Sequence, residues 1–196
     1  MPAPRSPVRR RALLAACLLL AACAAPPPRP AGIVTRPPRM EIGAFSLYGR
    51  MAARRGDERV VASVFWQHGS GSDTLLFSGP LGQGLAELVR DPGGARLTLA
   101  DGRRFGGADL EDLSTKIFGF ALPVSDLARW IVGDAAGGEI LRADPLGRPT
   151  DIEAAGWSIE LSDWESGGAD ALPTRVELHR ADIDMRVTIV DWQEVR

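Results

Sequence analysis

The chain has 196 residues, 45% of them hydrophobic, and a formal net charge of −2 at neutral pH. This length suits one domain with a sizeable apolar core. The acidic balance and the lack of a basic stripe argue against a nucleic-acid-binding protein, so we expect no nucleic acid among its partners.

The first 22 residues have the pattern of a secretory signal peptide: four arginines, an apolar run and small residues at a cut site. Leu20-Ala21-Ala22-Cys23 resembles the lipobox of bacterial lipoproteins, in which the cysteine becomes the first mature residue and carries the lipid. An ordinary signal peptide with a coincidental cysteine is the alternative. A second match ends at Cys17, but cleavage there would leave too short an apolar region.

Removal of residues 1–22 leaves 19 basic and 25 acidic residues and a single cysteine, Cys23. An exported chain would thus lack disulfides, and its stability would come from core burial. Residues 23–42 hold the predicted acylated cysteine and a Pro-rich segment, which favours an extended spacer. We expect the folded domain to occupy residues 43–196.

From residue 42 onward the apolar residues alternate with polar ones, as in β-strands. Val61 and Phe65 put apolar side chains on the second face of one strand, which predicts burial of both faces there. Arg55-Gly56-Asp57-Glu58 and Gly69-Ser70-Gly71-Ser72 are predicted turns. The strands expected in this half lie at residues 45–51, 60–67, 74–78, 85–90 and 96–100.

The period then becomes helical. Residues 109–118 and 123–131 carry apolar side chains at helical spacing, and Gly119 and Gly133 end the two helices. Strands resume at residues 139–143, 151–153, 158–163, 175–180 and 184–192. Strands, two helices and strands again predict an α+β fold, mostly antiparallel β, with helices on one face or end of the sheet.

Several short motifs follow one another in an order and spacing that resemble those of LolB, the outer-membrane lipoprotein receptor family of Gram-negative bacteria. They are Phe-x-x-x-Gly-Arg at 45–50, Phe-Trp-Gln at 65–67, Pro-Leu-Gly at 80–82, Gly-x-x-Leu-Pro-Val at 119–124, Leu-x-x-Trp-Ile-x-Gly at 127–133, Gly-Trp at 156–157, Leu-Pro at 172–173 and Ile-x-x-Trp at 189–192. The resemblance covers residues 44–194, and the lipobox agrees with it.

The resemblance implies an unclosed (half) β-barrel with short lid helices over a hydrophobic cavity. It also implies a function: the chain would accept lipoproteins from the soluble periplasmic carrier LolA and insert them into the outer membrane, without any cofactor. Its partners would be loaded LolA, the acyl chains of the cargo and the outer-membrane bilayer, and we expect a monomer. The chain departs from the family before Phe45, where no long amphipathic helix is apparent.

A carrier of acyl chains must cover them with apolar surface, because each CH₂ exposed to water costs about 0.8 kcal/mol. Our candidates for the cavity lining come from both strands and helices, and each could equally fill a closed core. They are Val60, Ala62, Val64, Trp66, Leu75, Phe77, Leu97, Leu99, Leu110, Ile117 and Trp130.

The turn at Pro80, Leu81 and Gly82 holds an apolar residue where turns are usually polar. Leu81 would either fold back onto the body or insert into lipid. The resemblance favours insertion, because the family has a protruding loop with an apolar residue at this motif. Burial of one leucine stabilises by only ~1.5–3 kcal/mol, so Leu81 would guide the handover while Cys23 anchors the chain.

No constellation for catalysis or metal binding is visible. His68 and His179 lie far apart, no Gly-x-Ser-x-Gly elbow occurs, and no ligand spacing fits zinc. We therefore expect neither an enzyme, a metal site nor a cofactor. Two other functions stay open: a lipoprotein that binds another lipid or glycolipid, and an envelope-assembly lipoprotein that binds proteins through a sheet edge. Retention in the outer membrane is suggested by Ala24 and Ala25, where an Asp would signal the inner membrane.

Overall fold

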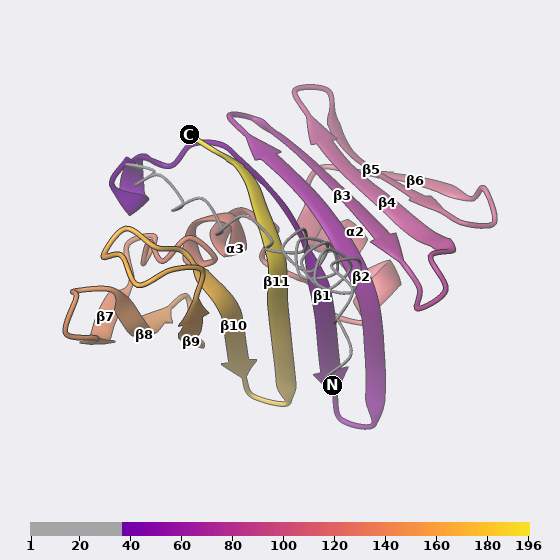
Figure 1. The fold of residues 1–196 in the computed structure, drawn as a ribbon. Helices are drawn as coiled ribbons and strands as arrows, with labels where there is room; N and C mark the ends of the chain where they lie inside the picture. Colours follow the sequence, from indigo (N-terminus) through magenta and orange to yellow (C-terminus); the bar gives the residue numbers. More distant parts are fainter. Residues whose placement is uncertain (1–36) are drawn as a thin grey trace, which may run out of the picture. The chain divides into compact units, whose positions relative to one another are not determined.

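The computed structural model describes residues 37–196 (Figure 1). The predictions for the signal peptide, for Cys23 and for the segment up to residue 36 lie outside the described residues. The elements are η1 (Arg39–Glu41), β1 (Phe45–Arg55), β2 (Glu58–Gly69), β3 (Ser72–Ser78), β4 (Gly84–Asp91), β5 (Gly94–Leu99), β6 (Arg104–Gly107), α2 (Leu110–Phe118), α3 (Val124–Trp130), β7 (Glu139–Ala143), β8 (Pro149–Ala154), β9 (Trp157–Trp164), β10 (Pro173–Arg180) and β11 (Ile183–Val195).

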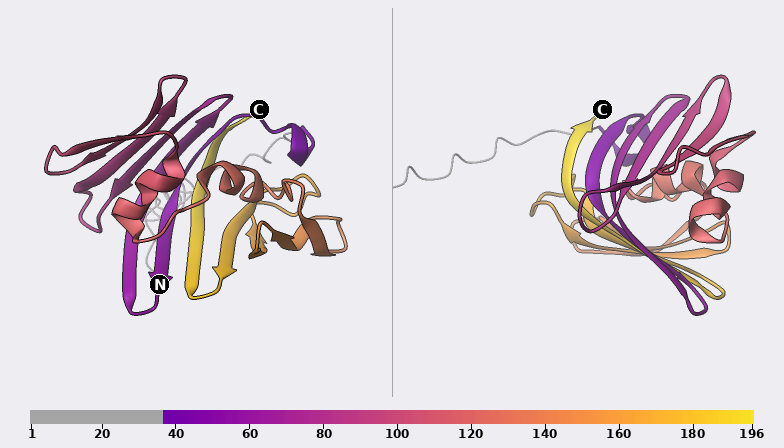
Figure 2. Two further views of the ribbon diagram at one scale, coloured as in Figure 1. Left: turned by 180° about the vertical axis from the view of Figure 1, so that it is seen from behind. Right: turned by 90° about the vertical axis from the view of Figure 1, so that its right-hand side faces the viewer.

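All eleven strands form one antiparallel sheet in the order β6-β5-β4-β3-β2-β1-β11-β10-β9-β8-β7. Each half of the chain is a meander, and the halves join where β1 pairs with β11. Strand β6, the last of the first half, and strand β7, the first of the second half, are therefore the two opposite edges of the sheet. The segment between them, residues 108–138, crosses the concave face of the curved sheet and carries α2 and α3 (Figure 2). We call this segment the strap.

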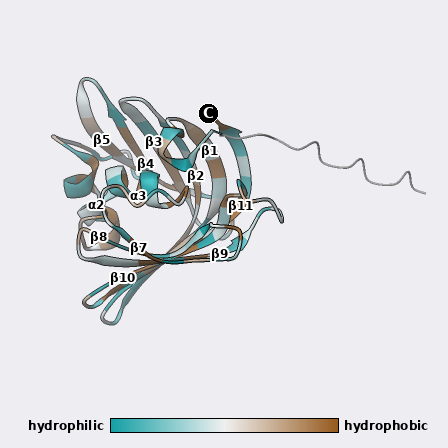
Figure 3. Ribbon diagram, turned by 90° about the vertical axis from the view of Figure 1, so that its left-hand side faces the viewer, coloured by the Kyte–Doolittle hydropathy of each residue, from teal (hydrophilic) through white to brown (hydrophobic). Residues whose placement is uncertain are grey.

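The predicted fold class is confirmed: an unclosed, mostly antiparallel sheet with two short helices. Strand residues alternate between a buried inner face and a solvent-facing outer face, so hydrophobic and hydrophilic residues follow each other along the ribbon (Figure 3). The expected burial of both faces of β2 is wrong. Val61 is exposed and Phe65 only half-buried, because no other element of residues 37–196 covers the outer face there.

The sequence pattern missed β6. This four-residue strand pairs with β5 and is too short to show alternation. Another local feature is Gly49 in β1, opposite a bulge in β11. A Cβ on Gly49 would lie 2.5 Å from the carbonyl oxygen of Thr188, so the close approach of β1 and β11 requires glycine at this position.

Helix α2 begins after Asp109, whose side chain accepts a hydrogen bond from the Asp112 amide at 2.9 Å. Gly119 ends it with a left-handed backbone (φ 77°), which glycine adopts without steric cost. Both ends follow the prediction to within one residue. The helix packs against β4, β5 and β6, and its Phe118 ring meets Phe77 of β3 edge-on at 5.5 Å.

The last residues of the expected Pro-rich spacer are part of the folded body. The Arg39 guanidinium donates to the carbonyl oxygens of Val132 and Ala171, at 2.7 Å each, and lies over the Trp164 ring. Arg39 thereby joins the loop after α3 to the loop before β10. Of the spacer predicted at residues 23–42, at least this end packs on the domain.

Candidate functional site

The inner face of the sheet and the strap enclose a continuous apolar layer. The structure brings all eleven candidate lining residues together in it. Eight are less than 5% exposed: Ala62, Val64, Trp66, Leu75, Phe77, Leu97, Leu110 and Trp130. Val60, Leu99 and Ile117 are half-buried and pack against the same cluster. These residues pack against one another in one buried cluster, and an open cavity for acyl chains stays a prediction.

Ser114 of α2 holds the strap together at its centre. Its hydroxyl is fully buried, donates to the Glu111 carbonyl at 2.6 Å and accepts from the Leu122 amide at 2.7 Å. A second contact joins the strap to the sheet: Arg55 Nη1 at the end of β1 donates to the Gly119 carbonyl at 2.9 Å. The Ser114–Leu122 hydrogen bond holds the linker between α2 and α3 against α2. The Arg55–Gly119 hydrogen bond holds the same linker against the β1–β2 hairpin.

Two indole groups in the core carry a buried N–H without a partner among the described residues: Trp130 Nε1 on α3 and Trp157 Nε1 on β9. A buried, unsatisfied donor costs about 1–3 kcal/mol. Trp66 differs from them, because its Nε1 donates to Asp73 at 3.0 Å. The apolar layer of the described residues therefore contains two hydrogen-bond donors that no protein group satisfies.

The Leu81 turn projects from the β3–β4 hairpin. The Gly82 amide donates to the Gly79 carbonyl at 2.9 Å, and Pro80 occupies the second turn position, which suits its fixed φ. Leu81, at the third position, is 93% exposed. The side chain thus points into solvent and does not fold back onto the body. Whether it enters lipid stays a prediction.

A second turn of the same kind was missed by sequence reasoning. Asp144-Pro145-Leu146-Gly147 joins β7 to β8, and the Gly147 amide donates to the Asp144 carbonyl at 2.9 Å. Leu146 occupies the same turn position as Leu81 but is only 48% exposed. The repeated Pro-Leu-Gly triplet was the signal that could have revealed it.

A buried polar cluster centred on Asp73 also went unnoticed in the sequence. Asp73 lies in β3 and is 1% exposed; it accepts from Trp66 and from Arg90 Nε at 2.9 Å, and His68 Nδ1 lies 2.7 Å away. Burial raises the pKa of Asp73, but the hydrogen bonds from His68, Arg90 and Trp66 outweigh it and bring the pKa below its ordinary value. The cluster satisfies its own charges and is structural.

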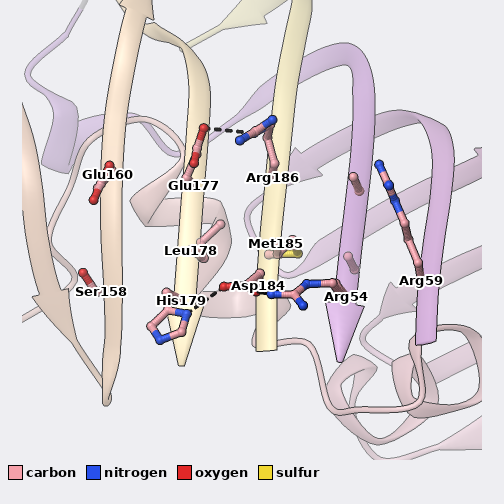
Figure 4. Close-up of a pocket in the computed structure, with 12 residues that line it drawn as sticks. Arg54, Arg59, Ser158, Glu160, Glu177, Leu178, His179, Asp184, Met185 and Arg186 are labelled. Atoms are coloured by element: carbon pink, nitrogen blue, oxygen red, sulfur yellow. Dashed lines mark hydrogen bonds and ion pairs between the residues drawn. The ribbon is translucent and has the colours of Figure 1, made fainter. Parts of the chain in front are cut away.

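A shallow groove of about 310 Å³ lies on the outer face, across the ends of β1, β2, β9, β10 and β11 (Figure 4). Its charged side chains are largely paired: Arg186 with Glu177 at 2.9 Å, and Asp184 with both Arg54 and His179. Hydrogen bonds from His179 and Arg54 lower the pKa of Asp184. A polar groove of this kind does not suit acyl chains.

Within residues 37–196 no group of three or more His, Cys, Asp or Glu side chains is arranged to hold a metal ion. In the same residues, none of the helices has the length and hydropathy that crossing a membrane requires.

An open antiparallel sheet curved around an apolar layer and a helical strap defines an unclosed half-barrel. A crystal structure of a LolA-superfamily protein from Nitrosomonas europaea superposes with a TM-score of 0.51 at 11% identity, over 81% of this chain and 87% of that one. This likeness establishes the fold alone.

The sequence comparisons identify the family. The family model "Outer membrane lipoprotein LolB" matches residues 43–192. Proteins named outer-membrane lipoprotein LolB from Azoarcus sp. and Thiobacillus denitrificans are 38% and 34% identical to the chain, over 76% and 82% of it and 78% and 88% of their own length. The chain belongs to the LolB family of outer-membrane lipoproteins, a family of lipoprotein-transport proteins and not of enzymes.

Proposed function

We propose that this chain accepts lipoproteins from the periplasmic carrier LolA and inserts them into the outer membrane, with the cargo's acyl chains held between the sheet and the strap. The observation that carries the proposal is the continuous apolar layer beneath a strap that is joined to the two sheet edges. Three acyl chains bring tens of kcal/mol of hydration cost, at about 0.8 kcal/mol per CH₂. The inner face supplies apolar surface for them.

Acceptance of acyl chains requires that α2 and α3 leave part of the inner face. Opening would break specific contacts, among them the Arg55–Gly119 and Arg39–Val132 hydrogen bonds and the edge-on Phe77–Phe118 contact. It would also withdraw the buried apolar side chains of the strap from the core. The chains then replace the strap's apolar side chains on the same surface, so the opened sheet need not stay exposed to water. Transfer without a nucleotide must run downhill in affinity, from the carrier to this chain and on to the bilayer.

The test is direct transfer. Purified protein lacking residues 1–23 is mixed with LolA that carries a labelled lipoprotein, and the two proteins are separated. We expect the label on the LolB-family chain. A label that stays on the carrier, with the recipient shown to be folded, would refute the proposal. Transfer of free lipid but not of lipoprotein would favour the alternative function, binding of another lipid.

Leu81 is proposed to act in delivery and not in acceptance. Leu81→Glu replaces an exposed apolar side chain, so folding and uptake of cargo from LolA should be unchanged, while insertion into liposomes should fall about tenfold or more, from the ~1.5–3 kcal/mol that burial of a leucine supplies. Leu146→Glu is the matched control, because it changes the same position of the same kind of turn. Equal loss of uptake and insertion in Leu81→Glu would contradict the assignment.

A further inference from the structure

The outer face of the sheet carries an unusual share of exposed apolar side chains. The outer face of an antiparallel sheet that packs on one side is normally polar. Ten large apolar side chains are exposed in the described residues, and six of them lie on this face or in the β3–β4 turn. The six are Tyr48, Val61, Leu76, Leu81, Leu85 and Val190.

These side chains are aligned across neighbouring strands. Tyr48 of β1 is opposite Phe65 of β2, and Phe65 is opposite Leu76 of β3. Tyr48, Phe65, Leu76 and Leu85 line one shallow groove of about 650 Å³, and Val190 sits at the β11 bulge beside Tyr48. We call these five residues the outer stripe. It runs at right angles to the strands, from β11 to β4.

The outer stripe leads to the Leu81 turn. Leu76 precedes this turn on β3 and Leu85 follows it on β4, so both flank the base of the hairpin whose tip is Leu81. Contiguous exposed apolar surface of this kind marks an interaction site. The protein is an outer-membrane lipoprotein, so a bilayer is always within its reach. Thirteen residues separate Cys23 from Pro37, and this length of chain spans at most about 50 Å.

We propose that the outer stripe is a membrane-contact face, which rests in the interfacial layer of the bilayer with Leu81 at its inserted end. This inference deepens the proposed function, because it names the surface that orients the protein during delivery. Tyr48 suits the interface, since its ring is apolar and its hydroxyl polar. The neighbouring charges have both signs: Arg50, Glu87 and Asp191. The contact is therefore apolar and does not depend on anionic lipid.

The test measures binding to vesicles without an anchor and without cargo. The mature chain with Cys23→Ser is floated with vesicles of phosphatidylethanolamine and phosphatidylglycerol. The double variant Leu76→Ser, Leu85→Ser should reduce the partition coefficient about tenfold or more, at about 25 cal/mol per Å² of apolar area. Omission of phosphatidylglycerol or addition of salt should leave binding within twofold of its value.

The matched control is Ile140→Ser, Leu141→Ser on β7. Its two residues are 51% and 52% exposed, against 42% and 36% for Leu76 and Leu85, and all four lie in strands. The control should bind vesicles like the parent. Equal loss in both doubles, or no loss in the stripe double, overturns the proposal, and so does binding that requires phosphatidylglycerol.

Two other occupants of the stripe give different results. If a second copy covers it, the stripe double changes the sedimentation coefficient and leaves vesicle binding unchanged. If residues 24–36 cover it, their deletion increases vesicle binding. Either result overturns the proposal. Transfer from loaded LolA, measured without vesicles, tests the proposed function separately. If transfer fails, the flotation assay still tests the membrane-contact face. If the parent protein fails to float with vesicles, the transfer assay still tests the proposed function.

Discussion

Removal of the Ser114 hydroxyl should loosen the strap specifically. Ser114→Ala leaves the buried Leu122 amide without its acceptor at 2.7 Å, and an unsatisfied buried donor costs about 1–3 kcal/mol. The higher helix propensity of alanine returns roughly 0.5 kcal/mol. The net loss of about 0.5–2.5 kcal/mol should lower the Tm by roughly 1–10 °C, since 1 kcal/mol shifts the Tm of a domain of this size by about 2–4 °C.

The assay combines thermal unfolding with amide hydrogen exchange. Amides in the linker between α2 and α3 should exchange up to about 60-fold faster in Ser114→Ala, because 1.4 kcal/mol corresponds to a factor of ten. Thr115→Ala is the control: the Thr115 hydroxyl makes the same backward hydrogen bond, to Asp112 at 2.6 Å, but it is exposed and does not contact the linker.

If strap opening limits the uptake of cargo, Ser114→Ala should be both less stable and faster in accepting a lipoprotein from LolA. If Ser114→Ala is less stable but accepts the lipoprotein more slowly than the parent, strap opening does not limit uptake, and contacts within the strap assist it. Unchanged linker exchange in Ser114→Ala, or equal changes in both variants, would refute the assignment of the Ser114–Leu122 hydrogen bond as the strap's central contact.

Three further predictions concern the core and the sheet. The pKa of Asp73 is lowered in the folded state, so its ionised form stabilises the fold above about pH 4, and this contribution disappears as pH falls through the folded-state pKa. Asp73→Asn should therefore lower the free energy of unfolding in urea by about 3 kcal/mol at pH 7. The difference between the variant and the parent should shrink below pH 4. Trp66→Phe should destabilise more than Trp130→Phe, by about 1–3 kcal/mol in the same assay, because Trp66 alone of the two loses a hydrogen bond. Gly49→Ala should destabilise by about 2 kcal/mol or more in thermal unfolding, because its Cβ would clash with the β11 backbone, while Gly43→Ala should be neutral because nothing lies within 4 Å.

Local patterns predicted the elements of this fold well where the physical signal is local. Alternation specified the long strands, and helical spacing of the apolar residues together with Gly119 specified α2. The pairing of β1 with β11 could not be inferred in this way, because it joins residues about 140 positions apart. The family resemblance implied an unclosed barrel but did not specify this pairing. Strand β6 was missed because two of its four residues are glycine, and its pairing with β5 is what makes it a strand.

The sequence also predicted some residues of the candidate site and not others. Apolar identity and alternation placed Trp66, Leu75 and Phe77 correctly on the inner face. The same signal misled at Phe65, because an apolar residue does not reveal whether anything covers it. Asp73 escaped notice since its cationic partner Arg90 is on the neighbouring strand.

The strap contact and the membrane contact meet on one strand. Phe77 of β3 touches α2 on the inner face, Leu76 belongs to the outer stripe, and Leu81 follows at the tip of the same hairpin. Lipid at the tip can shift the strap only if the hairpin has different positions in the closed and open states. Leu81→Glu should then leave the amide hydrogen exchange of the strap unchanged in the absence of vesicles. Any increase in that exchange rate that vesicles cause in the parent should be absent in the variant. If vesicles accelerate strap exchange equally in both proteins, the bilayer acts on the strap by another route, and delivery is not triggered through β3.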